Sequence, residues 1–346
     1  MHTPTSFWMN DWRLENTMRY QRSTLRTVAW LILIAACLAA CLYATFRWAD
    51  TIHKGDISPG FDISPSGKKI VFNSKENDHD LLFILDYPSG RVKQLMRTTG
   101  SIEEICVLND HQAVLSVRIQ RNRISSDIYA YLVDLNTGAI RRLTKAKRVW
   151  ETRIDRISSR KFILRQHLVR VYLTPFGWEI YGLEKSALVV NASDESIAPF
   201  LLDTSPYFLV QALDNSRAIV LSSYSSHGKR WFLAELDKPV DAPNARIARR
   251  QPLPIYSETL VASEDGRFFC YLLVDTTSQS YEIYCFDRRT QQTKRLVVFR
   301  NRIVQLKCVG DSLFFLTNSR YASIWRVHLD GSNLRQVVNI GSLAGK

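Results

Sequence analysis

The sequence predicts an all-β protein: a six-bladed β-propeller of four-stranded antiparallel blades, preceded by one N-terminal transmembrane helix. Two observations lead to this prediction. Strand–turn–strand segments recur along the chain at intervals of about forty to fifty residues, which is the period of propeller blades. Near its start the chain also has twenty consecutive uncharged, mostly apolar residues, enough for a helix to cross a bilayer.

The composition indicates a folded body with an acidic partner. The 346 residues are 46% hydrophobic and 23% charged, and the formal net charge is +13. Between Arg118 and Arg170, fourteen Lys and Arg stand against four Asp and Glu, so most of the excess charge lies in this part of the chain. A basic surface of this kind favours an acidic partner over a basic one.

The apolar segment at 27–46 predicts a signal-anchor helix, with a short cytoplasmic tail at 1–26 and a stalk at 47–57. The tail carries four arginines, whereas the twenty residues after the span carry one arginine and one lysine. The positive-inside rule therefore leaves the N-terminus in the cytoplasm and the body on the far side of the cytoplasmic membrane. In a Gram-negative bacterium that side is the periplasm.

A lipoprotein is the alternative to an uncleaved anchor. The segment Leu38–Cys41 resembles the lipobox of bacterial lipoproteins, and Cys41 would be the lipidated residue after cleavage. The long tail before the apolar run, and the continuation of that run to Phe46, favour the uncleaved anchor. Both alternatives place the body on the same side of the membrane.

The first blade shows the repeating unit. Phe61–Ser74 predicts a strand, a turn at Pro65–Gly67 and a second strand, and Phe83–Leu95 predicts another such pair. Thirteen-residue windows that align with this second pair without gaps begin at Tyr131, Trp178, Tyr284 and Trp325. The predicted propeller spans 58–340, with blades at about 58–100, 101–147, 148–196, 204–252, 257–300 and 301–340. Tandem hairpins in a β-sandwich are the alternative.

Two segments carry a resemblance to a known family. The S-P-x-G-x-x-I-x-F turn at Ser64–Phe72 and the D-x-x-T-G-x-x-x-x-L-T segment at Asp134–Thr144 resemble the repeat of TolB-type β-propellers. The resemblance covers roughly 280 residues. It departs at Ser158–Arg160, which replaces the turn in blade three, and in blade four. It implies partners among envelope proteins, including lipoproteins, and no cofactor.

The sequence contains no motif that indicates catalysis. It lacks the G-x-S-x-G elbow of α/β-hydrolases, a P-loop, an H-E-x-x-H pair and a G-x-G-x-x-G fingerprint. The cysteines outside the apolar segment show no C-x-x-C spacing, and His79 is expected in a solvated loop. The chain is therefore expected to be no enzyme and to need neither a cofactor nor a metal.

A basic rim is the candidate binding site. It lies in and just after the predicted connection from blade two to blade three, where loops gather on one side of a propeller, and consists of Lys145, Lys147, Arg148, Trp150, Arg153 and Arg156. Such a rim suits anionic lipid headgroups, an acidic protein or a glycan. Nucleic acid is disfavoured because the body is expected outside the cytoplasm.

Cys270 and Cys285 flank the predicted Thr276–Ser280 loop symmetrically, so they are expected to face each other across one hairpin. In an oxidising compartment they are predicted to form a disulfide.

These expectations support two hypotheses on function. In the first, the chain is a non-catalytic, membrane-anchored propeller that acts as a protein-interaction scaffold in the cell envelope. In the second, it is an acidic-polysaccharide-binding or carbohydrate-active propeller. A cluster of His, Asp and Glu residues near the propeller axis would favour the second.

Overall fold

The structure is a computed structural model that divides the chain into two compact units, Met1–Ile57 and Ser58–Lys346. It describes Ile34, Cys37 and residues 60–76, 79–120, 126–147, 149–174, 177–194, 196–200, 202, 208–213, 217–225, 228–318 and 322–343. The predicted tail, anchor helix and stalk therefore lie outside the described residues, apart from Ile34 and Cys37. In the described part, no helix has the length and apolar character needed to span a membrane.

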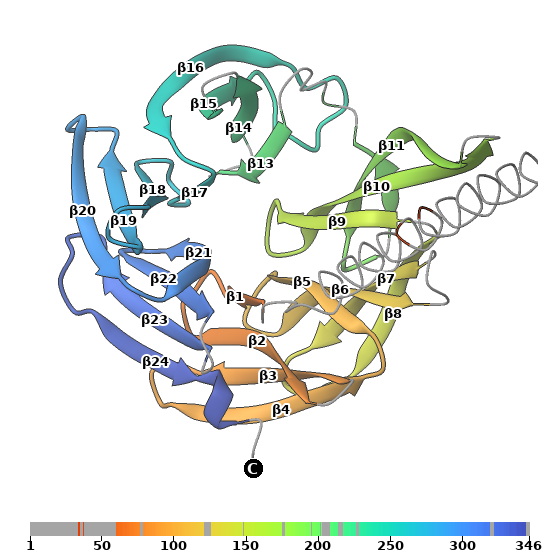
Figure 1. Cartoon of the computed structure of the whole chain (residues 1–346), viewed down its shortest axis with the longest axis horizontal. Helices are drawn as coiled ribbons and strands as arrows, with labels where there is room; N and C mark the ends of the chain where they lie inside the picture. Colours follow the sequence, from red (N-terminus) through yellow and green to blue (C-terminus); the bar gives the residue numbers. More distant parts are fainter. Residues whose placement is uncertain are drawn as a thin grey trace, which may run out of the picture. The chain divides into compact units, whose positions relative to one another are not determined.

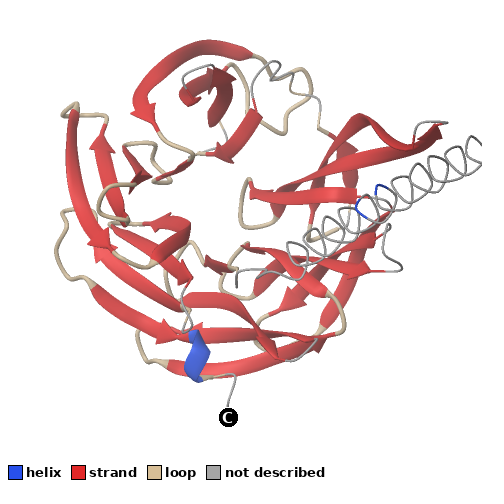
Figure 2. Cartoon of the chain, viewed as in Figure 1, coloured by secondary structure: helices blue, strands red, loops and turns tan. Residues whose placement is uncertain are grey.

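The second unit consists of four-stranded antiparallel sheets (Figures 1 and 2). Their strands are β1 Phe61–Ile63, β2 Lys69–Glu76, β3 His79–Asp86, β4 Arg91–Thr98, β5 Ser101–Val107, β6 Gln112–Gln120, β7 Ser126–Asp134, β8 Ile140–Lys147, β9 Val149–Arg156, β10 Lys161–Thr174, β11 Gly177–Asn191, β12 Ile197–Pro199, β13 Phe208–Ala212, β14 Ala218–Ser225, β15 Gly228–Leu236, β16 Ile247–Tyr256, β17 Thr259–Ala262, β18 Phe268–Asp275, β19 Ser280–Asp287, β20 Gln292–Phe299, β21 Arg302–Val309, β22 Ser312–Asn318, β23 Ser323–His328 and β24 Arg335–Asn339. A short 3-10 helix, η2, follows at Ile340–Ser342.

Each sheet contains four strands that are consecutive in the chain. The first strand of each blade is the innermost, because these first strands contact one another in a cycle: β1 with β5, β5 with β9, β9 with β13, β17 with β21, and β21 with β1. Two hydrogen bonds between Gln211 on β13 and Ala262 on β17 complete the cycle. The predicted six-bladed propeller with four-stranded blades is confirmed.

The burial of each strand follows its place in the blade. The third strand of blade 1, β3, is buried from Asp80 to Leu85 without alternation, because neighbouring blades cover both faces of the sheet. The outermost strand β4 is instead largely exposed or half-buried and carries Arg91, Lys93 and Arg97. Charged side chains on such an edge discourage pairing with other sheets.

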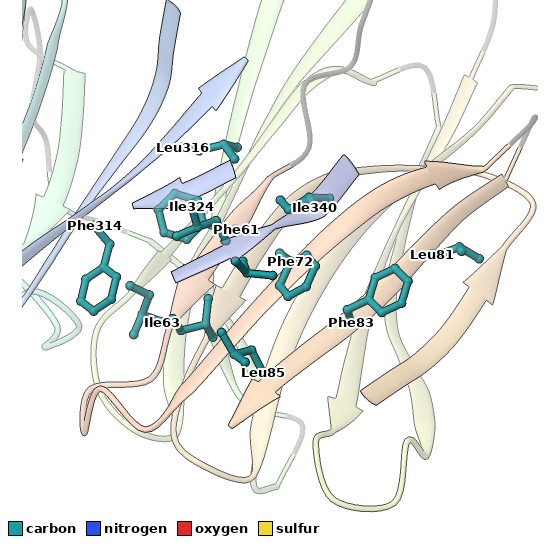
Figure 3. Close-up of a cluster of buried hydrophobic side chains, with 12 residues drawn as sticks. Phe61, Ile63, Phe72, Leu81, Phe83, Leu85, Phe314, Leu316, Ile324 and Ile340 are labelled. Atoms are coloured by element: carbon teal, nitrogen blue, oxygen red, sulfur yellow. The ribbon is translucent and has the colours of Figure 1, made fainter. Parts of the chain in front are cut away.

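Non-covalent contacts alone close the ring between blades 1 and 6, because each blade is built from one continuous stretch of chain. A buried cluster joins Phe61, Phe72 and Phe83 of blade 1 to Phe314 and Leu316 of blade 6 (Figure 3). Burying each large apolar side chain of this kind contributes about 1.5–3 kcal/mol to stability.

Blade 3 departs from the predicted repeat. The thirteen-residue window that begins at Trp178 was expected to contain a strand, a turn and a second strand. It lies instead within the single strand β11, and the fourth strand of the blade is the three-residue β12. The prediction was wrong here because β11 pairs with β10 through the whole window, so its turn-compatible middle residues lie in the strand.

Candidate functional site

The innermost strands carry polar side chains that bond to the next blade around the ring. Gln305 on β21 accepts a hydrogen bond from the Phe61 N–H and donates one to the Phe61 carbonyl, both at 3.0 Å. Gln211 on β13 makes the same two bonds, also at 3.0 Å, with Ala262 on β17. An innermost strand is a sheet edge with unpaired backbone groups, and one carboxamide satisfies a donor and an acceptor together.

A β-bulge precedes both glutamines. The register of the innermost strand shifts between Ile303 and Gln305 in blade 6 and between Leu209 and Gln211 in blade 4. A bulge inserts one extra residue and changes the direction of the side chains that follow it. The bulges therefore explain how a glutamine side chain in an otherwise apolar innermost strand reaches the neighbouring blade.

Glu104 occupies the corresponding place in blade 2, after a bulge between Ile102 and Glu104 on β5. Its Oε2 accepts a hydrogen bond of 2.9 Å from the Ile154 N–H of blade 3. Burial, and then the nearby Asp155 carboxylate, raise the pKa of Glu104 from 4.5 to about 8. A protonated carboxyl group can accept and donate as the two glutamines do, whereas a carboxylate can only accept.

Asp62 and Lys307 form an ion pair across the junction of blades 1 and 6, with Nζ and Oδ1 3.1 Å apart. Asp62 Oδ2 also accepts a hydrogen bond of 2.7 Å from the Val107 N–H of blade 2. Burial is the largest influence on the pKa of Lys307 and lowers it, but Asp62, Cys106 and Glu104 together raise it by more, so the net shift is upward. The Asp62–Lys307 pair therefore joins three consecutive blades of the ring.

Arg156 of blade 3 contacts the same residue, Val107, that donates to Asp62. It lies on β9, and its Nη1 donates to the Val107 carbonyl at 3.1 Å. Asp155, beside it in the chain, accepts a hydrogen bond of 2.7 Å from Arg165 Nε on β10. These charged groups are therefore engaged in contacts within and between blades. Within the described residues, no three His, Cys, Asp or Glu side chains come together as they would to hold a metal ion.

The predicted basic rim is divided between two blades. Lys145 and Lys147 lie on β8, the outermost strand of blade 2, and Trp150 lies on β9. Arg148 falls outside the described residues. Arg153 is exposed and Arg156 is half-buried, and both belong to β9, the innermost strand of blade 3. Both follow the connection between the two blades, Arg156 bonds to Val107 at the junction of blades 2 and 3, and the binding role of the rim stays a prediction.

Cys270 and Cys285 are directly opposite each other on β18 and β19, as the sequence predicts. Both are buried free thiols with their sulfur atoms 3.3 Å apart. The bonds to the Cys285 and Cys308 sulfurs, followed by burial, raise the pKa of the Cys270 thiol. Their disulfide stays a prediction.

In protein purified under non-reducing conditions from an oxidising compartment, Cys270 and Cys285 are expected in one disulfide-linked peptide pair. The geometry favours it, because directly opposed strand residues lie within the Cα separation that a disulfide tolerates. Mass spectrometry of non-reduced peptides, with thiols alkylated before digestion, measures this directly. Alkylation of both cysteines in such protein would refute the pairing.

Sequence reasoning missed Gln305, Gln211, Glu104 and the Asp62–Lys307 pair. The available signal was a polar residue inside the short apolar strand that precedes each blade turn, as in Phe61–Ile63. That signal gives neither the bulge nor the neighbouring blade that the side chain contacts, because both depend on how the ring closes.

Comparison with known proteins rests on structure. No protein-family model matches the chain. No curated protein matches it by sequence either.

Solved structures show the fold. TolB from Acinetobacter baumannii matches with a TM-score of 0.54 and 11% identity, over 77% of this chain and 62% of that one. An Agrobacterium tumefaciens protein assigned as TolB matches with a TM-score of 0.50 and 8% identity, over 77% of this chain and 90% of that one. An acylaminoacyl peptidase bound to a chloromethyl ketone matches with a TM-score of 0.50 and 12% identity, over 82% of this chain and 45% of that one.

This chain therefore spans less than two thirds of the Acinetobacter TolB and less than half of the peptidase. At these identities the likeness shows the fold alone, which is that of a TolB-type β-propeller. Because a peptidase shares it, the fold does not distinguish a binding protein from the propeller of an enzyme.

Proposed function

We propose that this chain is a non-catalytic, membrane-anchored β-propeller that acts as a protein-interaction scaffold in the cell envelope. The observation that carries the proposal is that polar side chains of the innermost strands are engaged in contacts between blades. Asp62, Glu104 and Arg156 each bond to the backbone of a neighbouring blade, so they hold the ring together. The blades then form a rigid support for loops that contact a partner.

The anchor in this proposal is the uncharged segment at 27–46, with the N-terminus in the cytoplasm and the propeller across the membrane. The alternative is a lipoprotein attached through Cys41. The TolB-type fold supports an envelope location by analogy. Partners are then envelope proteins, and the basic stretch of blades 2 and 3 offers a cationic contact surface for acidic groups on them.

The acidic-polysaccharide hypothesis keeps one supporting observation, which is the same basic stretch. This hypothesis would be favoured by a cluster of His, Asp and Glu side chains near the propeller axis. Among the described acidic side chains of the innermost strands, Asp62, Glu104 and Asp155 each accept a hydrogen bond from the protein itself. The scaffold is therefore the better supported of the two.

Replacing Lys145, Lys147 and Arg148 together by glutamate is expected to weaken binding to the protein partner at least tenfold without unfolding the propeller. The physical reason is the loss of attraction to an acidic surface and its replacement by repulsion. Pull-down from solubilised membranes, compared with binding to acidic polysaccharide and anionic vesicles, identifies which ligand class depends on these charges.

A matched control changes the net charge equally elsewhere. Arg91, Arg97 and Arg289 are exposed in blades 1 and 5, and their replacement by glutamate should leave binding unchanged. Equal losses in both variants would indicate a nonspecific effect of net charge. Loss of polysaccharide binding alone would favour the second hypothesis.

A further inference from the structure

The second and third strands of blade 3 are much longer than their equivalents. β10 has 14 residues and β11 has 15. The corresponding strands of the other blades have six to nine residues. At about 3.3 Å per residue, six additional residues extend a hairpin by about 20 Å.

This extension has no further strand beside it in the described part of the chain. β9 pairs with β10 only as far as Leu168, and β12 pairs with β11 only at Leu188–Val190. Residues 169–174 and 177–183 pair with each other alone. Figure 1 shows the β10–β11 hairpin projecting past the end of β9.

The register of the extension separates its residues into two faces. Leu173 is opposite Trp178 and Val171 is opposite Ile180, so these four residues share one face. We call Val171, Leu173, Trp178 and Ile180 the apolar face. The residue pair between them, Tyr172 and Glu179, belongs to the other face, and so does Arg170, opposite Tyr181. One face is therefore entirely apolar and the other is polar and aromatic.

The hairpins between the same strands of the other blades contrast with this one. Their tips have the sequences Lys75–Asp80, Gln120–Ser126, Ser225–Lys229, Asp275–Ser280 and Asn318–Ala322, in which polar residues predominate. The blade 3 hairpin instead has no charged residue from Val171 to Trp178. A polar tip suits water, whereas an extended apolar face needs another surface to cover it.

Three observations select a lipid bilayer as that surface. β8 ends at Lys147, two positions before Val149, and Val149 pairs with Leu168 where the hairpin leaves the blade. Lys145 and Lys147 of β8 therefore lie close in the chain to the base of the hairpin. Cations near a membrane surface attract anionic headgroups. The hairpin also carries Trp178 and two tyrosines, the side chains that favour the membrane interface. The third observation is the uncharged segment at 27–46 of the same chain.

We propose that the apolar face of the β10–β11 hairpin enters the interfacial region of a bilayer bearing anionic headgroups, as a second membrane contact besides the N-terminal segment. The proposal rests on the proposed membrane anchoring only for the choice of a bilayer over another apolar surface. Entry into the interfacial region fits a short amphipathic element, because its polar face stays among the headgroups.

The test uses the full chain reconstituted in vesicles of equal parts phosphatidylcholine and phosphatidylglycerol, with or without bromine on the acyl chains. Bromine quenches the emission of a tryptophan that reaches the acyl chains. Trp178→Phe is expected to remove part of the quenched emission. Trp325→Phe is the matched control, because Trp325 of blade 6 packs against Phe299 of blade 5, with ring centroids 5.0 Å apart, and should leave the quenched component unchanged.

A double variant, Leu173→Ser with Ile180→Ser, keeps Trp178 and is expected to abolish its quenching while the circular dichroism of the propeller is retained. Equal quenching in the wild type and Trp178→Phe would overturn the proposal, and so would protection of the hairpin by a purified protein partner but not by vesicles. Resistance to alkaline extraction reports the N-terminal anchor separately. Quenching of Trp178 without such resistance would support the hairpin contact and refute the anchor.

Discussion

Replacing Gln305 by leucine is expected to lower the free energy of unfolding by about 2–3 kcal/mol. Leucine has nearly the volume of glutamine but cannot hydrogen bond, so the Phe61 N–H and carbonyl both lose their partner. Each unsatisfied group costs on the order of 1–3 kcal/mol, and the lower part of that range suits groups at a strand edge. Chemical denaturation of the purified chain measures the loss.

The position of Gln305 adds a second expectation. Blades 1 and 6 have no chain connection across their junction, so weakening it should open both blades locally. Hydrogen exchange is therefore expected to accelerate in β1 and β21. Gln211→Leu removes the same two bonds between blades 4 and 5, which are consecutive in the chain, and should show faster exchange only near β13 and β17. Unchanged stability and exchange in Gln305→Leu would contradict closure through this carboxamide.

Glu104→Gln is expected to remove a loss of stability that the wild-type protein shows as pH rises. The folded protein holds a proton on Glu104 up to about pH 8, whereas the unfolded chain releases it near the ordinary pKa of 4.5. Between these values the folded state binds more protons, so the free energy of unfolding falls with rising pH. The fall attributed to Glu104 is about 2–4 kcal/mol by pH 8 and is complete above it.

The glutamine variant should be the more stable protein above pH 8, because its carboxamide can both accept from and donate to Ile154 as Gln305 does with Phe61. Denaturation at a series of pH values from 5 to about 9 measures both slopes. Glu103→Gln is the matched control, since the neighbouring Glu103 pairs with Arg118, and it should retain the wild-type slope. Parallel pH profiles for wild type and Glu104→Gln would exclude a protonated Glu104.

The blade architecture was predictable because it depends on local sequence signals that recur from blade to blade. The turn at Pro65–Gly67 requires a glycine, and Gly67 has a φ of 73° that other residues rarely adopt. Gly266, in the equivalent turn between the first two strands of blade 5, has a φ of 66°. Since such signals recur in most blades, errors in one repeat leave the fold prediction intact.

The inter-blade contacts and the long hairpin were not predictable in the same way. Gln305 and Phe61 are 244 positions apart and meet only when the ring closes. The Trp178 window has the composition of a strand–turn–strand segment, but it lies in one strand, β11. Arg156 illustrates the consequence for function: the sequence places it among binding residues, and the structure shows that its guanidinium bonds to Val107 of the preceding blade.

The scaffold role is tested most directly by photocrosslinking in the native membrane. A photoreactive amino acid is placed at Lys145, Lys147 or Arg153, and at Arg91 in blade 1 as the control position. A scaffold predicts that one envelope protein is crosslinked from the three former positions and not from Arg91, and that the same protein, once purified, binds the wild-type chain. Adducts with polysaccharide or lipid alone, or the same set of proteins from all four positions, would contradict it.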